Sequence, residues 1–166
     1  MRLARQVLID APPARVWALI DDDRNLALWM PNLIGTRFPD GRPDAKAGAS
    51  RVGTRFIQTL QVEGGGTSEY AGEVTEYKPG QMLGTRLTPQ AFTVDVRYYV
   101  TADPEHDGTA LVYTCRTRAN TWYGWGMLMI GSKMLGPIAD AQLAALRRAA
   151  EDPDVVVYGA PKARQA

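Results

Sequence analysis

Residues 9–20 read IDAPPARVWALI, and they join a strand-like run, Arg2–Ile9, to a helix with one apolar face. Asp10 can cap this helix. Pro12 and Pro13 suit its first positions, because the N–H that proline lacks would have no partner there. The stretch therefore predicts a strand that is followed directly by a helix.

That helix is expected to end near Asp21, and Asp23 or Asn25 can start a second short helix. Pro31 ends the second helix, because a residue before proline is pushed out of the helical region. The three aspartates at 21–23 could attract a cation, but they lack the alternating ligand spacing of a calcium loop. We interpret them as helix caps and solvated charges.

Residues 33–119 alternate between apolar and polar side chains, which is typical of antiparallel strands. Signals for turns recur along them and predict consecutive hairpins, at residues 64–66, 78–80, 88–90 and 103–108. In the clearest strand, residues 92–101, one face is polar and the other is apolar, the apolar set being Phe92, Val94, Val96, Tyr98 and Val100.

A long helix is predicted at the end of the chain, because Ala139, Leu143, Leu146 and Ala150 recur at helical spacing. Its start is open between Pro137 and about residue 120, since four glycines between 124 and 136 each weaken a helix interior by about 1 kcal/mol. We expect a kink near residues 136–137. A tail follows the domain, which we predict to span residues 1–151, and residues 155–158 could add an edge strand or lie free.

The composition narrows the classes of function. With 19 Lys and Arg against 18 Asp and Glu, the chain has no overall field that would recruit nucleic acid. The one cysteine, Cys115, excludes an internal disulfide. No signal peptide is recognisable, so a cytoplasmic location is expected. The most apolar stretch, residues 122–138, contains Lys133 and is too short to span a bilayer, so we expect no stable membrane insertion.

The order of elements resembles the START-like or SRPBCC superfamily, and most closely its polyketide cyclase/dehydrase and lipid transport branch. The segments that carry the resemblance are residues 9–17, 28–31, 51–56 and 73–80. The resemblance implies an α+β helix-grip fold, in which about seven antiparallel strands curve around a long C-terminal helix. Two short helices follow the first strand.

In that fold a cavity lies between sheet and helix, and the resemblance implies that it takes a hydrophobic small molecule, such as a lipid or a polyketide-like or polycyclic compound. The predicted lining combines apolar, phenol, hydroxyl and amide side chains: Phe56, Gln58, Tyr70, Thr85, Val96, Tyr98, Tyr113, Thr117, Trp122, Trp125 and Met129. The alternative is that these side chains fill one another's space as an ordinary core.

Evidence for catalysis is sparse. The one histidine, His106, falls in a polar turn, and Cys115 is interpreted as a small buried hydrophobe. We predict no metal and no cofactor. Cyclases and dehydratases of the resembled branch would use phenol or arginine contacts, for which the candidates are Tyr98, Tyr113 and Arg116. Other charges of the sheet, such as Asp95 and Arg97, are interpreted as surface pairs.

Residues 121–130 are too apolar for a solvated helix. We favour a cavity wall or core helix, and a homodimer face or a membrane-touching gate are the alternatives. The sequence thus predicts a carrier or sensor of a hydrophobic small molecule. A polyketide cyclase, aromatase or dehydratase and a protein- or membrane-interaction module stay open.

Overall fold

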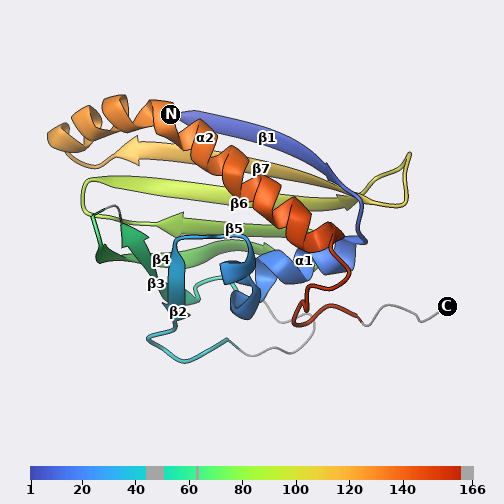
Figure 1. Cartoon of the computed structure of the whole chain (residues 1–166). Coiled ribbons are helices and arrows are strands. Elements are labelled where there is room, and N and C mark those ends of the chain that lie inside the picture. Colours follow the sequence, from blue (N-terminus) through green and yellow to red (C-terminus); the bar gives the residue numbers. More distant parts are fainter. Residues whose placement is uncertain (44–50, 63, 162–166) are drawn as a thin grey trace.

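In the computed structural model, seven strands form one antiparallel sheet in the order β1-β7-β6-β5-β4-β3-β2 (Figure 1). The strands are β1 (Arg2–Ile9), β2 (Leu33–Arg37), β3 (Arg55–Val62), β4 (Gly66–Lys78), β5 (Met82–Leu87), β6 (Phe92–Ala102) and β7 (Thr109–Ala119). The helices are α1 (Pro13–Asp21), the 3-10 helix η1 (Asp23–Leu28) and α2 (Trp122–Glu151). The structure describes residues 1–43, 51–62 and 64–161, without the side chains of 127, 128, 130–132 and 134. The predicted α+β helix-grip fold is confirmed.

The hairpins follow the turn signals in the sequence. The β3–β4 turn contains Gly64 and Gly65 at φ values of 94° and 87°, a region that glycine adopts without steric cost. The register shifts between Val74 and Glu76 in β4, and between Leu33 and Gly35 in β2. Such bulges bend a strand and increase its twist, which helps this sheet to curl around the helices.

The start of α1 differs from the expectation. Its N-cap is Pro12 and no side chain caps it, so Asp10 is not the cap. The backbone N–H of Asp10 instead donates to Glu151 Oε1 at 3.0 Å, which ties the end of β1 to the end of α2. The second short helix, η1, does begin at the aspartate run, where the Asp22 side chain accepts from the N–H of Arg24.

Helix α2 runs without a break from Trp122 to Glu151, with Pro137 inside it. Of the two predicted starts of this helix, the one at Pro137 is therefore wrong and the one near residue 120 is confirmed. The Thr121 side chain caps α2 by accepting from Gly124 N at 3.1 Å. Figure 1 shows that the two halves of α2 run in different directions, as expected for a helix with an internal proline. No helix in the described part of the chain is long and apolar enough to cross a membrane.

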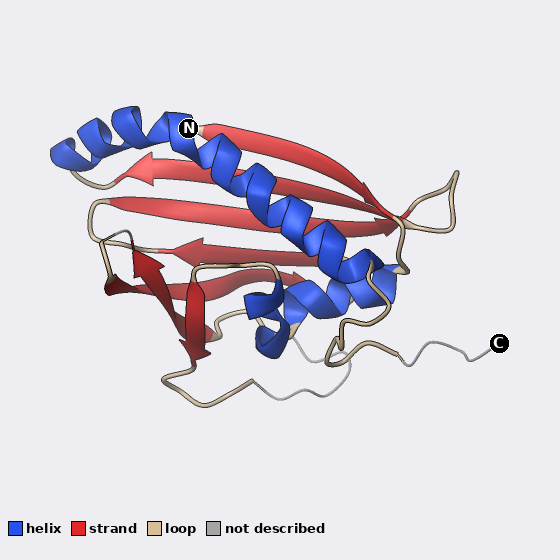
Figure 2. Cartoon of the chain, viewed as in Figure 1, coloured by secondary structure: helices blue, strands red, loops and turns tan. Residues whose placement is uncertain are grey.

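The core lies between the inner face of the sheet and two helices, α1 and the C-terminal half of α2 (Figure 2). Ile9, Leu19, Leu111 and Leu146 have at most 2% of their surface exposed. The outer face of the sheet carries the charges, as predicted. Asp95 differs from its interpretation as a surface charge, because it is buried there, 2.6 Å from both Arg86 and Arg118.

Residues 155–158 of the tail neither add a strand nor lie free. The side chain of Asn25, in η1, is fully buried and donates to the carbonyl oxygens of Ala18 at 2.8 Å and Tyr158 at 2.9 Å. Its oxygen accepts from Tyr158 N at 2.9 Å. Arg15, in α1, donates to Val155 O at 2.9 Å. Residues 155–158 therefore fold back over the two short helices.

Candidate functional site

Three cross-strand rows of β5, β6 and β7 form the middle of the inner face. Each row is fixed by the strand register, and the rows are Leu83–Tyr98–Tyr113, Thr85–Val96–Cys115 and Leu87–Val94–Thr117. Side chains at alternate positions share one face of a strand, so phenol, thiol and hydroxyl groups stand here among apolar neighbours. The surface suits a ligand that is mostly apolar and has a few polar atoms.

Tyr98 and Tyr113 stand side by side in the first row, with ring centroids 5.4 Å apart. Trp29 packs its ring edge-on against Tyr98 at 6.0 Å. Burial raises the pKa of both phenols well above the ordinary tyrosine value, and for Tyr113 the neighbouring Tyr98 adds to the effect. Both phenols are therefore neutral near pH 7, and they can donate hydrogen bonds but cannot act as bases.

Thr117, in the third row, holds a buried polar atom that the described residues leave without a partner. The residue is 2% exposed, and its Oγ1 makes no hydrogen bond. Its backbone is fixed, because Thr117 O accepts from the N-terminal ammonium group of Met1 at 2.8 Å and Thr117 N donates to Met1 O at 2.9 Å. A buried hydroxyl without a partner is costly and requires an explanation.

Strands β3 and β4 extend the same face. Phe56 is buried, whereas Gln58, Leu60 and Tyr70 are half-buried. The strands pack tightly here, because a Cβ on Gly72 would lie 2.6 Å from the Phe56 ring and 2.8 Å from Leu87 Cδ2. The structure thus brings together the predicted sheet residues on one face, namely Phe56, Gln58, Tyr70, Thr85, Val96, Tyr98, Tyr113 and Thr117.

Arg116 does not join them. It is exposed and lies on the outer face of β7, because it alternates with the inward residues Cys115 and Thr117. The candidate polar set on the inner face therefore contains no arginine from β7.

The predicted helix residues are also placed differently. Trp122, Trp125 and Met129 are 88%, 64% and 61% exposed, so the expectation that they face the sheet is not met in this structure. Their spacing puts them on one line of α2, while the buried Gly124 lies on another side of the helix. The sequence could not separate the two faces, because both are apolar.

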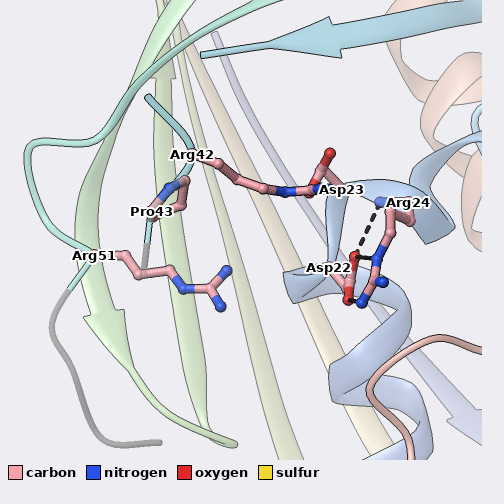
Figure 3. A pocket seen from close by; sticks show the side chains of 6 residues that line it. All are labelled: Asp22, Asp23, Arg24, Arg42, Pro43 and Arg51. Atoms are coloured by element: carbon pink, nitrogen blue, oxygen red, sulfur yellow. Dashed lines mark hydrogen bonds and ion pairs between the residues drawn. The ribbon is translucent and has the colours of Figure 1, made fainter. Parts of the chain in front are cut away.

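A polar hollow of about 210 Å³ lies beside η1, outside the predicted set (Figure 3). It is lined by Asp22, Asp23, Arg24, Arg42, Pro43 and Arg51. Arg24 pairs with Asp22 at 2.6 Å, and Arg42 pairs with Asp23 at 2.5 Å. The charges that line this hollow are thus largely neutralised by one another, and the Arg42–Asp23 pair ties η1 to the segment after β2.

Arg51 connects this hollow to a half-buried acid. Its Nη1 lies 3.1 Å from Asp21 Oδ1, and Tyr77 donates its hydroxyl to Asp21 Oδ2 at 3.3 Å. Burial raises the pKa of Asp21, although the charge of Arg51 opposes the shift. Burial and the nearby Asp21 charge raise the pKa of Tyr77 to about 12. Sequence reasoning missed this cluster, because its members are far apart in the chain.

Two further residues match their sequence interpretation. His106 is exposed in the β6–β7 turn, with Nδ1 3.1 Å from Asp103 Oδ2. Cys115 is buried, and burial raises the pKa of its thiol, so it is not a reactive thiolate near pH 7.

Several solved structures are similar to this chain. A START superfamily protein from Mycobacterium smegmatis is 17% identical with a TM-score of 0.65, over 90% of this chain and 97% of that one. A protein from Chromobacterium violaceum is 16% identical with a TM-score of 0.69, over 91% of this chain and 97% of that one. The di-domain ARO/CYC protein BexL from the BE-7585A biosynthetic pathway is 16% identical with a TM-score of 0.69, over 92% of this chain and 50% of BexL. At such identities the likeness shows the fold alone.

Comparison with curated proteins gave no match. The sequence profile of one family, described as polyketide cyclase/dehydrase and lipid transport, matches residues 1–151. This match covers the sheet and the three helices of the described residues, and it agrees with the resemblance drawn from the sequence. The chain belongs to the polyketide cyclase/dehydrase and lipid transport family.

Proposed function

We propose that the protein binds a hydrophobic small molecule against the inner face of its sheet, as a carrier or sensor. The observation that carries the proposal is the buried Thr117 hydroxyl without a partner, at the end of a row with Leu87 and Val94. A ligand oxygen or N–H at this point would satisfy the hydroxyl. Family membership supports the same class of ligand.

The affinity would come mainly from apolar contact. Leu60, Leu87 and Val94 are half-buried although they face the helix side of the sheet, so they retain surface that a ligand can cover. Each 100 Å² of apolar surface removed from water contributes about 2.5 kcal/mol. The neutral phenols of Tyr98 and Tyr113 and the Thr117 hydroxyl would then select ligands by hydrogen bonding.

The first experiment is mass spectrometry of an organic extract of the purified protein, followed by binding measurements with the compound found. Thr117→Val keeps the shape of the side chain and removes the hydroxyl. We expect this variant to bind the compound about fivefold more weakly. It should also unfold at higher urea than the unliganded wild type, because it removes an unsatisfied buried group.

Thr114→Val is the matched control, since Thr114 is half-buried on the same strand but on the outer face. It should leave the affinity unchanged. An empty extract, together with failure to bind a panel of fatty and polycyclic compounds, would refute the proposal. Equal affinity of the Thr117→Val variant would refute the role of the hydroxyl.

A cyclase or dehydratase is the second candidate, and the observation that favours it is the pair of neutral phenols 5.4 Å apart. Such phenols can protonate or stabilise a developing enolate. This function predicts turnover of a poly-ketone substrate that Tyr98→Phe or Tyr113→Phe reduces by about a hundredfold or more. Binding without turnover would leave the carrier function.

A further inference from the structure

The N-terminal half of α2 exposes a line of side chains that we call the α2 stripe: Trp122, Trp125, Met129 and Lys133. The four residues are spaced by three, four and four positions, which places them one above another on a helix. Trp122 is 88% exposed, Trp125 64% and Met129 61%, and Lys133 is also exposed. Tyr123, beside the stripe, is 46% exposed.

Exposed tryptophans at this density are unfavourable in water, because each indole can remove 150–250 Å² of surface from solvent, by a rough estimate. The sequence between Trp122 and Gly131 contains no charged residue, whereas a helix at the surface normally has a charged or polar outer face. A surface that covers the stripe would therefore stabilise it.

The charged residues around the α2 stripe indicate what kind of surface would cover it. Segments 1–6 and 114–139 contain Arg2, Arg5, Arg116, Arg118 and Lys133, and they contain no aspartate or glutamate. Arg5 pairs with Asp140, and Arg118 pairs with Asp95. Arg2 and Arg116 are both exposed and lie directly opposite each other in the β1–β7 pair, although like charges in that position repel.

These segments meet at one end of the molecule. The Met1 ammonium group donates to Thr117 O, and α2 begins a few residues after β7 ends. Figure 1 shows the start of β1, the end of β7 and the start of α2 at the same end of the sheet. Exposed indoles and unbalanced cations are thus gathered in one region.

We infer that this end of the molecule docks on the surface of an anionic lipid bilayer. Tryptophan and tyrosine favour the boundary between headgroups and acyl chains, and lysine and arginine near the surface each contribute attraction to anionic headgroups. A second copy of the chain is the less suitable occupant, because a symmetric contact uses the same patch of both copies and would bring two positively charged patches into one interface. The inference does not depend on the proposed internal ligand, because the vesicles that test it contain none of that ligand.

The test is flotation of the full chain with phosphatidylcholine vesicles, with and without phosphatidylglycerol. Binding is expected to the mixed vesicles, to be stronger there than to pure phosphatidylcholine, and to fall as salt is added. Tryptophan emission should shift to the blue on binding. The change reports on the stripe because, of the other two tryptophans, Trp29 is buried and Trp17 packs against the core.

Two variants and two controls make the test specific. Trp122→Ser combined with Trp125→Ser should weaken vesicle binding by about tenfold or more, and Lys133→Glu should weaken binding only to the anionic vesicles. Val156→Ser, at a residue 72% exposed in the tail, is the apolar control. Arg148→Glu, at an exposed position in the C-terminal half of α2, is the charge control. Both controls should bind as the wild type does.

Failure of the wild type to float with anionic vesicles would overturn the inference. So would unchanged flotation of the double tryptophan variant. A third overturning result is a dimer in sedimentation velocity that the Trp125→Ser variant dissolves, because the stripe would then be an interface between copies. Unchanged urea midpoints of the variants would establish that lost flotation is not lost folding.

Discussion

Asn25 links three elements through one side chain. It has no exposed surface, and its amide makes hydrogen bonds to Ala18 O, Tyr158 O and Tyr158 N. Buried polar groups of this kind are nearly always hydrogen-bonded, and here the three bonds hold α1, η1 and the tail together. Polarity alone would place this residue on the surface of a short helix, so its role could not be predicted from the sequence.

Asn25→Ala should lower the free energy of unfolding by about 2–3 kcal/mol, because three hydrogen bonds are lost and backbone groups are left unpaired. Urea unfolding measures the change, and hydrogen exchange should show faster exchange around Tyr158. Asn120→Ala is the control, since Asn120 is exposed and its side chain accepts one exposed hydrogen bond, from Thr93, and it should change stability by less than about 1 kcal/mol. Equal effects of the two substitutions would contradict this role of Asn25.

Two neighbouring aspartates should respond to pH in opposite directions. Burial raises the pKa of Asp21, so the folded state binds the proton of this carboxyl more tightly than the unfolded state does. Asp21 therefore stabilises the fold at low pH, and this contribution is lost as pH rises through the raised pKa. The hydrogen bond from Arg24 lowers the pKa of Asp22, so its stabilisation is present above the ordinary aspartate value and is lost as pH falls through the lowered value.

Urea midpoints of the wild type, Asp21→Asn and Asp22→Asn between about pH 3 and about pH 7 test this. The Asp21→Asn variant should gain relative to the wild type as pH rises, and the Asp22→Asn variant should gain as pH falls. The charge of Arg51 opposes the effect of burial on Asp21, so it makes the trend of the Asp21→Asn variant smaller without reversing its sign. Shifts of the same sign in both variants would contradict the assignment.

At the scale of elements, the sequence predicted the strands well because two independent signals coincided there. Alternation over residues 92–101 assigned the faces of β6, and the glycine or proline turns set where each hairpin ends. The helix ends were harder. Asp10 has the side chain of an N-cap, but Glu151, distant in sequence, accepts its backbone N–H, so local preference did not decide the start of α1.

The first turn of α2 depends on a close approach that only glycine permits. A Cβ at Gly124 would overlap the carbonyl oxygen of Ala91, whereas one at Gly126 would meet nothing within 4 Å. Gly124→Ala should therefore destabilise the protein by about 1–3 kcal/mol and speed exchange in the first turn. Gly126→Ala should leave stability unchanged or raise it by up to about 1 kcal/mol, through helix propensity. Equal midpoints for the two variants would show that α2 is not anchored at Ala91.

Across the whole molecule, the candidate site was predictable only on its sheet side. Tyr98, Tyr113 and Thr117 follow from alternation once the register is known, whereas Arg116 falls on the opposite face by the same rule. The helix side could not be predicted, because the exposed line through Trp122 and Trp125 is as apolar as a buried face would be. Only the three-dimensional path of α2 shows which face of the helix is exposed and which is buried.

Removal of the tail would test whether the predicted domain, residues 1–151, folds without it. In the full chain Asn25 and Arg15 bind the backbone at Tyr158 and Val155, so a chain that ends at Glu151 loses those bonds and leaves part of the Asn25 amide unpaired. We expect the shortened chain to unfold cooperatively, about 2–3 kcal/mol less stable than the full chain.

Asn25→Ala should cost less in the shortened chain than in the full chain, because only the bond to Ala18 is left to lose. This double-mutant comparison separates a tail that acts through Asn25 from one that merely covers apolar surface. Equal costs of Asn25→Ala in both chains would refute the link, and loss of cooperative unfolding after truncation would place the tail inside the domain.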